Sequence, residues 1–443
     1  MNKPNIVFVH SHNTGRYIQP YGYAVPTPNL QHLSETGIVF RQAFAAGPTC
    51  SPSRASFMTG MVPHSCGMLG LAHRGFALTD YGEHLARFLK PAGYTTVLSG
   101  VEHTAPNLPM VGYDKILSFH QIELPDARNP KDPAQAASGF LRSGPQEPFF
   151  LSVGLFETHR PFPKADPKNH PAEDPRYCRP PRPLPDVPQT RADMADFKAA
   201  ARLMDEKFGL VLDALEDSGL ADSTYVFCFC DHGIQFPLNI CNLTDHGIAV
   251  FFLARGPRYF HGGRDVDAMV SLIDLVPTVC DLAGIPIPER VQGRSLLPLI
   301  DGESENLHDT LFAEVNYHAA YEPTRCVRTR RYKYIRRYDR RDHLVLPNVD
   351  DTPSKDFMLA AGWAERPREQ EMLYDLSFDP DEINNLIDNE NYRSIREELS
   401  MRLDRWMEET GDPLLDGPVS APVGSYLNDP DDLSPEDPTY RVS

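Results

Sequence analysis

The first residues that could do chemistry lie in a short segment near residue 50. Cys50 is followed by Pro52 and Arg54, so a potential nucleophile stands beside a fixed positive charge where a helix is expected to start. A structural cysteine in a loop that caps a helix would show the same short pattern. The segment by itself therefore leaves both interpretations open.

Polar residues also gather beside the apolar runs. His12 and Asn13, Glu102 and His103, Glu157 to His159, and Asp231 and His232 follow four of these runs, and Asp245 and His246 precede a fifth. In an open parallel sheet, ligands bind beyond the carboxyl ends of the strands. Carboxylate, imidazole and amide groups at those ends predict a site for a divalent metal. In the alternative, Asp231 caps a helix and His232 only packs.

The elements that must position these groups alternate along the chain. Short apolar runs predict strands at residues 5–10, 95–98, 149–154, 224–230 and 249–254. Helical spacing predicts helices at 28–37, 81–92, 194–215 and 271–283. Alternating strands and helices predict an α/β fold with a mostly parallel central sheet flanked by helices. A proline-rich stretch at 161–188 follows a strand and is expected to be a surface loop or an active-site wall.

Near residue 310 the pattern changes. Residues 325–336 alternate apolar and basic side chains as an exposed strand would, 372–376 read as another strand, and 392–406 as an amphipathic helix. We expect a catalytic domain at 1–310 and a small C-terminal α+β subdomain at 311–443, with a short antiparallel sheet. The acidic, proline-rich tail after Asp416 is expected to wrap the surface or to be disordered.

Composition excludes some classes of protein. The chain has 443 residues, with 61 acidic against 43 basic side chains and a net charge of −18, which argues against a nucleic-acid or anionic-membrane binder. The sequence lacks an apolar run of the roughly 20 residues needed to span a bilayer, and the N-terminus does not resemble a secretory signal. The eight scattered cysteines suggest a reduced, cytoplasmic protein.

Several motifs, in order, resemble those of the sulfatase family, which has the alkaline-phosphatase-like fold. The segment from Thr49 to Ser56, ending Thr59-Gly60, matches the family signature. The others are Pro4-Asn5-Ile6-Val7, Pro28-Asn29-Leu30, Gly93-Tyr94-Thr95-Thr96, Asp231-His232-Gly233, Asp274-Leu275-Val276-Pro277-Thr278, Gly293-Arg294-Ser295-Leu296, the segment from Arg328 to Tyr334 and Leu373-Tyr374-Asp375-Leu376. An ordered set over nearly the whole chain is far more specific than any single motif.

The resemblance implies a chemistry for Cys50. In that family the cysteine is oxidised to formylglycine, and a hydroxyl of the hydrated aldehyde attacks sulfur with the help of a metal. The same matching gives Arg54 as the signature arginine, His103 as the base beside the nucleophile and His159 as the group that contacts sulfate or protonates the leaving group. The metal ligands implied are His12, Asn13, Cys50, Asp231 and His232.

The chain departs from the family pattern at several of these positions. His12 and Asn13 stand where the family has two aspartates, and Val101 and a position near Ile240 stand where it has lysines. With Asp231 as the only clear carboxylate, we expect weaker binding of a hard cation or a different metal. Arg74, Arg160, His246 and His318 are the candidates to replace the lost cations, and the substrate-binding residues predicted are His246, His318 and Arg160.

These observations predict a sulfatase-type hydrolase that cleaves a sulfate ester or sulfamate of a carbohydrate or other small molecule. Its cofactors would be a divalent metal, Ca²⁺ first with Mg²⁺ or Mn²⁺ as alternatives, and formylglycine made from Cys50 by a formylglycine-generating maturase. A homo-oligomer is left open. The alternatives are a phosphonate or phosphodiester hydrolase of the same superfamily and a catalytically weakened homologue that binds anions.

Overall fold

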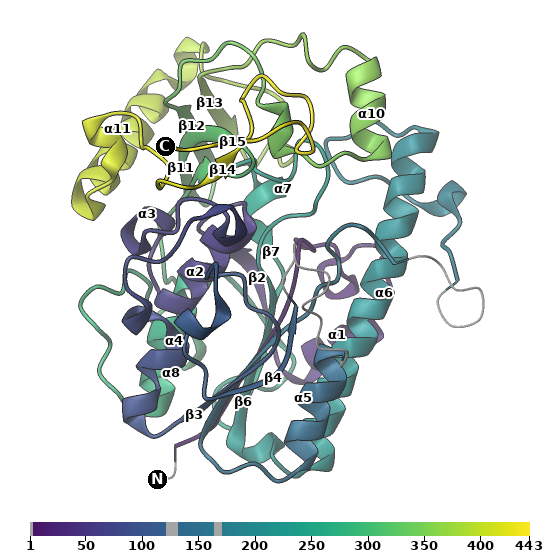
Figure 1. Cartoon of the computed structure of the whole chain (residues 1–443), viewed down its shortest axis with the longest axis vertical. Coiled ribbons are helices and arrows are strands. Elements are labelled where there is room, and N and C mark those ends of the chain that lie inside the picture. The colour runs from purple at the N-terminus through teal and green to yellow at the C-terminus, as the bar shows by residue number, and fades with distance from the viewer. Residues whose placement is uncertain (1–2, 121–131, 164–170) are drawn as a thin grey trace.

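The computed structural model describes residues 3–120, 132–163 and 171–443. In this part of the chain, a large sheet with helices on both faces forms the lower body in Figure 1, and a small antiparallel sheet lies above it. The N-terminus is at the bottom of the large body, whereas the C-terminus lies near its junction with the small sheet.

The large sheet has nine strands in the order β4-β3-β5-β1-β6-β8-β2-β7, with β9 also paired to β2. The pairs of β1 with β5 and β6, of β3 with β4 and β5, and of β2 with β9 are parallel, whereas β2 and β6 pair antiparallel with β8, and β2 with β7. The prediction of a mostly parallel central sheet is confirmed. The strands are β1 Asn5–Ser11, β2 Ile38–Phe44, β3 Thr95–Val101, β4 Lys115–His120, β5 Phe149–Gly154, β6 Thr224–Cys230, β7 Ala249–Val250, β8 Phe252–Arg255 and β9 Arg264–Ser271.

Strand β1 lies at the middle of the sheet and all seven of its residues are buried. Because helices cover both faces, its sequence is apolar without alternation. The Phe8 ring packs edge-on against Phe150, Phe227 and Phe229, with ring centroids 5.2 to 5.6 Å apart. This packing holds β1 and its neighbours β5 and β6 rigidly, and their carboxyl ends carry the candidate site.

Figure 1 shows α1, α5 and α6 on one face of the sheet and α2, α4 and α8 on the other. The predicted continuous helix at 81–92 is wrong: it is broken into 3-10 turns at Tyr81–Glu83 and Lys90–Ala92 around a single α-turn. The His84 ring interrupts it by accepting a hydrogen bond from the Ala86 amide, and Pro91 lacks the amide hydrogen of a helix interior. The helices are α1 Pro28–Thr36, α2 Cys50–Thr59, α3 Pro63–Cys66, α4 Leu85–Phe88, α5 Pro133–Arg142, α6 Pro188–Asp217, α7 Asp245–Ile248, α8 Leu275–Ala283, α9 Leu297–Ile300, α10 Pro353–Ala360 and α11 Arg393–Thr410.

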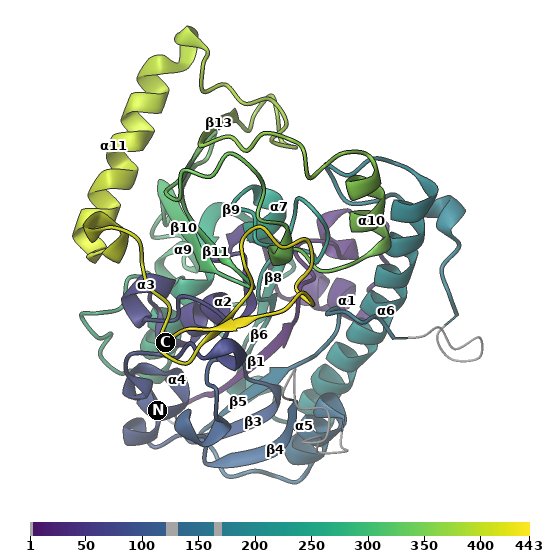
Figure 2. The ribbon, with the colours of Figure 1, turned by 45° about the horizontal axis from the view of Figure 1, so that its top comes forward.

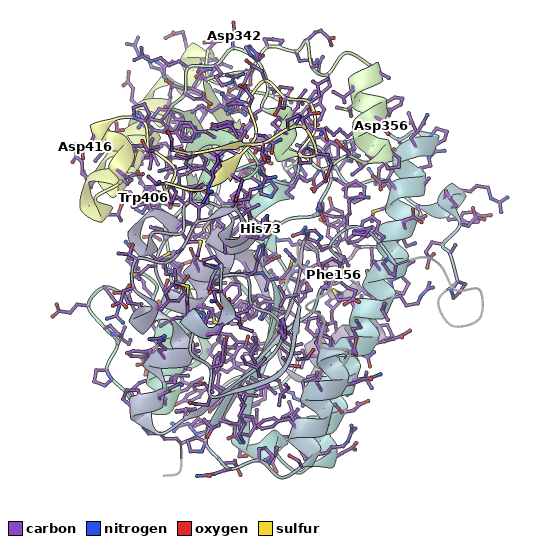
Figure 3. All side chains as sticks on the ribbon, in the orientation of Figure 1. His73, Phe156, Asp342, Asp356, Trp406 and Asp416 are labelled. Atoms are coloured by element: carbon purple, nitrogen blue, oxygen red, sulfur yellow. The ribbon has the colours of Figure 1, made fainter. Side chains whose placement is uncertain are left out.

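The small sheet is antiparallel, with β10 Thr310–Tyr317, β11 Tyr321–Thr329, β12 Tyr332–Arg337 and β13 Glu371–Asp375 in that order. The prediction of a single exposed strand at 325–336 is wrong, because a turn divides it into β11 and β12, and their central residues are buried. They are buried because α11 covers one face of this sheet and the large sheet with α7 covers the other. Trp406 of α11, labelled in Figure 3, stacks on Phe312 of β10 with ring centroids 4.8 Å apart.

The acidic tail lies on the surface in an ordered arrangement, which is the first of the two alternatives predicted for it. Its short strands β14 Tyr426–Leu427 and β15 Tyr440–Arg441 pair antiparallel, and Figures 1 and 2 show it returning over the junction of the two sheets. Of the proline-rich loop at 161–188, residues 164–170 lie outside the described residues. Within the described ranges, no helix combines the length and apolar character that a bilayer crossing requires.

Candidate active site

Cys50 is the first residue of α2, a helix whose ten residues are all buried. Thr49 before it is extended, and Gly60 ends the helix with a φ of 74°, a conformation that glycine adopts without strain. The Cys50 Sγ atom lies 3.4 Å from Nε2 of His232 and 3.9 Å from Oδ1 of Asn13. The structure therefore brings the cysteine of α2 to the carboxyl ends of β1 and β6.

Asp231 is the charged centre of this group. Its Oδ1 accepts hydrogen bonds of 2.9 Å from the backbone amides of Asn13 and His232, and its Oδ2 accepts one of 3.1 Å from Nε of Arg54. Nη1 of Arg54 lies 3.0 Å from Nδ1 of His10, where the arginine must be the donor. Arg54 is fully buried, so its charge neutralises Asp231 in a region shielded from water.

Four side chains at this point could hold a metal ion. One donor atom from each of His12, Cys50, Asp231 and His232 lies within 4.8 Å of the others. Both ring nitrogens of His12 are buried without a hydrogen-bond partner, which is costly unless a ligand occupies them. Nδ1 of His232 lies 3.1 Å from the Gly233 carbonyl, so it carries the proton and leaves the Nε2 lone pair facing Cys50. These residues fit a divalent cation, and their donors include two imidazoles but one carboxylate.

Two more histidines face the same region. His103 shares a hydrogen bond of 2.8 Å with His73, and the two rings are parallel within 3°. The His159 ring lies 4.4 Å from that of His12, and its Nδ1 bonds the Arg160 carbonyl. Burial lowers the pKa of His12, His103 and His159, so each is a neutral imidazole near pH 7 and can accept a proton.

Asn13 and His103 also share an unusual backbone. Each has a φ of 61°, the left-handed region that residues other than glycine seldom adopt. Both follow the ends of strands, β1 and β3. Residues in this conformation persist only where the surrounding structure holds them, and they gather at functional sites.

A cavity of about 750 Å³ opens over Cys50. It brings together the predicted residues Cys50, His103, His159, Arg160 and His318, and also Arg74. The sequence analysis missed further lining residues, which include His73, Asp193, Gln235, Asp350 and Glu436. His73, labelled in Figure 3, sits on a turn anchored by the bond from the Ala72 amide to Ser51 of α2; no strand end or periodicity marks it in the sequence.

The family model for sulfatases matches residues 4–285, more than half of the chain. The chain belongs to the sulfatase family. The C-terminal model of N-sulphoglucosamine sulphohydrolase matches residues 242–359. As the motifs predicted, a member of this family is a sulfuric ester hydrolase, and the family hydrolyses sulfate esters or sulfamates.

Three relatives illustrate the family. Human N-sulphoglucosamine sulphohydrolase is 30% identical over 89% of this chain and 88% of its own length. An ulvan-active sulfatase of Formosa agariphila is 28% identical over 95% of this chain and 83% of its own. The crystal structure of a phosphonate monoester hydrolase of Agrobacterium radiobacter aligns with a TM-score of 0.68 at 20% identity, covering 95% of this chain and all of that one; this likeness concerns the fold, and the alkaline-phosphatase-like fold class is confirmed.

The two positions at which the resemblance led us to expect lysines have different surroundings. Val101 is buried in β3, and Ile240 presents an apolar side chain to the cavity. Arg160 is a cation in the wall, but it pairs with Asp193 at 2.7 Å and stacks on Phe162 at 4.2 Å. Burial lowers the pKa of His318 to about 3, so this residue offers a neutral ring rather than a charge.

His246 is not brought to the Cys50 cavity. It lines a second cavity, and its Nε2 lies 3.2 Å from the Asp381 carbonyl. Asp245 and His246 open the short helix α7 before β7, which runs antiparallel to its neighbour β2. Because β7 runs antiparallel to β2, the residues that precede β7 lie at the edge of the sheet where the parallel strands end. At that edge they line the second cavity and not the Cys50 cavity.

Proposed function

We propose that this chain hydrolyses a sulfate ester or sulfamate on a carbohydrate, with a nucleophile made from Cys50. The observation that carries the proposal is the position of Cys50 at the start of a fully buried helix, facing both the candidate metal ligands and the cavity. The human relative is named for a sulfated sugar, N-sulphoglucosamine, which favours a carbohydrate substrate.

The thiol itself is a poor nucleophile in this setting. Burial, and then the charge of Asp231, raise the pKa of the Cys50 thiol well above its usual range, and a protonated thiol does not attack. Formylglycine would supply a hydroxyl in its place. The structure thus gives a physical reason for the modification that the family resemblance implies.

The chain's own residues have separable tasks in this proposal. Arg54 holds Asp231 in place from within the protein. Neutral His103, oriented by its bond to His73, can accept the proton released at the nucleophile. His159, whose Nδ1 bonds the Arg160 carbonyl, lines the cavity, where it can contact sulfate or deliver a proton to the leaving oxygen.

His12, Asn13, Asp231 and His232, with the Cys50 position, would hold a divalent metal, which polarises the sulfate group when bound. The sequence predicted Ca²⁺ with Mg²⁺ or Mn²⁺ as alternatives. Ca²⁺ prefers six to eight oxygen ligands, whereas imidazole suits transition metals. The two imidazoles therefore favour Mn²⁺ among these three.

The proposal is tested by expressing the chain with a formylglycine-generating maturase. Peptide mass analysis should find the aldehyde at Cys50, and the mature protein should turn over an aryl sulfate. Cys50→Ala should reduce that rate by at least on the order of 10³-fold without loss of folding. An unmodified cysteine together with no hydrolysis would instead support the weakened, anion-binding alternative, which the replaced aspartates and lysines motivate.

Parallel assays with an aryl sulfate, a phosphodiester and a phosphonate separate the two hydrolase alternatives. The sulfate should be the best substrate. The phosphonate monoester hydrolase has the same fold, so the fold alone does not distinguish sulfur from phosphorus. Faster turnover of the phosphodiester or phosphonate would overturn the choice of a sulfate substrate.

A further inference from the structure

A second cavity of about 840 Å³ lies between the loop after β1, the loop at 177–182, the start of α6 and the small sheet. It shares no lining residue with the Cys50 cavity. Phe197 of α6 stands between them, since its ring contacts Tyr17 of the second cavity and Phe162 of the first at 6.3 and 6.2 Å. This hollow is therefore a separate site.

The charge of its lining is opposite to that of the molecule. The chain has a net charge of −18, yet six cations and two carboxylates line this cavity. They are Arg16, Arg179, Arg182, Lys198, Arg328 and Arg330, with Asp245 and Asp381. A concentration of positive charge in a hollow raises the local concentration of anions.

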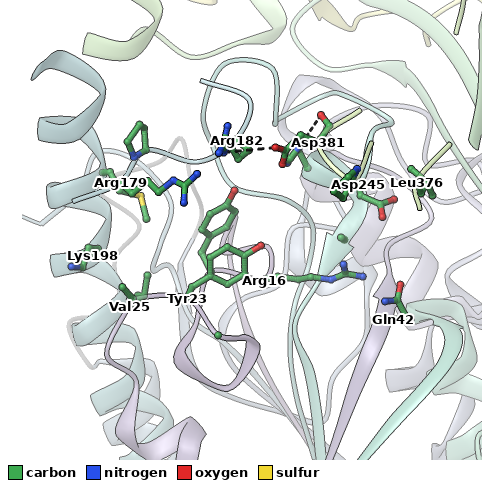
Figure 4. A pocket seen from close by; sticks show the side chains of 18 of the residues that line it. Arg16, Tyr23, Val25, Gln42, Arg179, Arg182, Lys198, Asp245, Leu376 and Asp381 are labelled. Atoms are coloured by element: carbon green, nitrogen blue, oxygen red, sulfur yellow. Dashed lines mark hydrogen bonds and ion pairs between the residues drawn. The ribbon is translucent and has the colours of Figure 1, made fainter. Parts of the chain in front are cut away.

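Arg16 is a cation of this lining whose hydrogen bonds are incomplete. Its Nε is buried and has no hydrogen-bond partner in the described part of the chain, its Nη2 has a long bond of 3.4 Å to the Ala43 carbonyl, and the guanidinium stacks over the Phe44 ring at 4.8 Å. Burial lowers the pKa of this guanidinium although the charge of Asp245 acts to raise it. Since Asp245 is shared with Arg328 and Lys333, a further negative group would stabilise Arg16. Figure 4 shows its side chain extended across the lower part of the cavity toward Gln42.

The two carboxylates that line the cavity do not neutralise all six of its cations. Asp245 is already held by Arg328 at 2.8 Å and by Lys333 at 2.6 Å. Asp381 lies 3.7 Å from Arg182, whose side chain is at the top of Figure 4. Among the described residues, the exposed side chains of Arg179 and Arg330 have no ion pair. A ligand with two or more negative groups could meet these arginines and Arg16 together.

Tyrosine rings border the same cavity. Tyr17 and Tyr23 pack with ring centroids 4.4 Å apart, and Tyr177 leaves 78% of its surface exposed at the rim. Exposed aromatic rings with a polar tip are suited to ligands that are apolar on one face and polar at the edge, as sugar rings are. We propose that this second cavity binds an anionic saccharide, a sugar bearing sulfate or carboxylate groups, apart from the Cys50 site.

The test uses calorimetry on the full chain carrying Cys50→Ala, so that no substrate is consumed. The probe is a disulfated disaccharide, compared with the same sugar without sulfate, with a uronate disaccharide and with inorganic sulfate. We expect two binding sites for the disulfated sugar. Arg179→Glu with Arg330→Glu should weaken one of them about tenfold or more, and Arg16→Gln should weaken the same site.

Arg366→Glu with Arg405→Glu is the matched control, because both side chains are exposed and neither lines either of the two cavities. Binding that Arg179→Glu with Arg330→Glu leaves unchanged at every site, or equal binding by the two charge-reversal pairs, would overturn the proposal. So would equal affinity for the neutral sugar or for inorganic sulfate. Binding of the uronate at this site alone would identify carboxylate as the preferred group.

The readout does not depend on turnover. In the mature protein without the Cys50→Ala substitution, the Arg179 and Arg330 reversals should leave kcat/KM for a small aryl sulfate unchanged. If the mature protein proved inactive, the proposed function would fail while the weakening of binding by Arg179→Glu with Arg330→Glu still decided this inference.

Discussion

At the scale of single residues, the segment that carries the nucleophile matches the family signature, whereas the residues around it depart from the pattern that the resemblance leads us to expect. Cys50 and Arg54 are where the family signature expects them, but His12 supplies an imidazole beside the only clear carboxylate, Asp231. The buried nitrogens of His12 make no hydrogen bond, and Nε2 lies 3.5 Å from Oδ2 of Asp231, an arrangement that fits a ligand shared by the two side chains.

His12→Asp should change the metal preference of the site. The wild-type chain should bind Mn²⁺ more tightly than Ca²⁺, and the variant should bind Ca²⁺ about tenfold more tightly than wild type, because a charged oxygen replaces a nitrogen. Calorimetric titration with each metal measures this without any substrate. His32→Asp, at an exposed position, is the control; equal gains in both variants would mean that the effect is only one of net charge.

At the scale of elements, a buried ion-pair network joins α3 to the small sheet. Glu314 of β10 accepts a bond of 2.9 Å from His64 of α3 and lies 3.1 Å from Arg325 of β11. Arg325 also bonds Asp412 after α11 at 2.9 Å. The helix that follows α2 in the chain is therefore held against the small sheet.

Glu314→Gln should lower the free energy of unfolding by about 1.5 to 3 kcal/mol, because it removes the charge that faces Arg325 and His64 while Asp412 still pairs with Arg325. Burial alone would raise the pKa of Glu314, but Arg325 and His64 outweigh it and lower the pKa to about 2, from 4.5. The stability it adds is therefore present above pH 4.5 and lost as the pH falls toward 2. Urea unfolding at several pH values checks both statements, with exposed Glu409→Gln as the control; an unchanged pH dependence in Glu314→Gln would contradict them.

Helix α11 covers the small sheet through a few buried side chains. Leu403→Ala should cost about 2 to 5 kcal/mol of unfolding free energy, since the fully buried leucine packs in the core with Trp406 and leaves a cavity when shortened. Met401→Ala on the same helix removes a side chain that is 63% exposed and should change stability by less than about 0.5 kcal/mol. Similar losses of unfolding free energy in the two variants would show that helix propensity, and not burial of the side chain, determines the effect.

At the scale of the whole molecule, the acidic tail returns to the mouth of the Cys50 cavity, where Pro435 and Glu436 line it. Asn428 anchors the tail by accepting a bond of 2.9 Å from Arg74. The far end of the chain thus borders the site built by its first strand. The division into domains at residue 310 and the cytoplasmic location stay predictions.

Glu436→Gln should lower KM for a sulfated sugar about two- to five-fold with little change in kcat, because it removes an exposed negative charge that repels the anionic substrate. Steady-state kinetics at low salt measure the effect, which should shrink at high salt. Glu409→Gln makes the same change away from the cavity. An unchanged KM in Glu436→Gln would mean that the tail does not approach bound substrate.

The sequence by itself determined the parts that depend on local order along the chain. The apolar run of β1 predicts a strand buried on both faces, and the segment from Thr49 to Gly60 predicts the helix that begins at Cys50. The ordered motifs predicted the family, the fold class and the group of Cys50, Asp231 and His232, because strand ends of a parallel sheet meet at one edge.

Only the tertiary structure decided which distant segments share a cavity. His73, Asp350 and Glu436 line the site from turns and loops that carry no periodic signal, and His246 follows the expected pattern yet lines the second cavity. Residues 325–336 are divided by a turn into β11 and β12, and the burial of these strands depends on α11 at one face and on the large sheet at the other. The physical reason is the same throughout: burial and cavity walls arise from contacts between segments far apart in the chain, which local spacing does not encode.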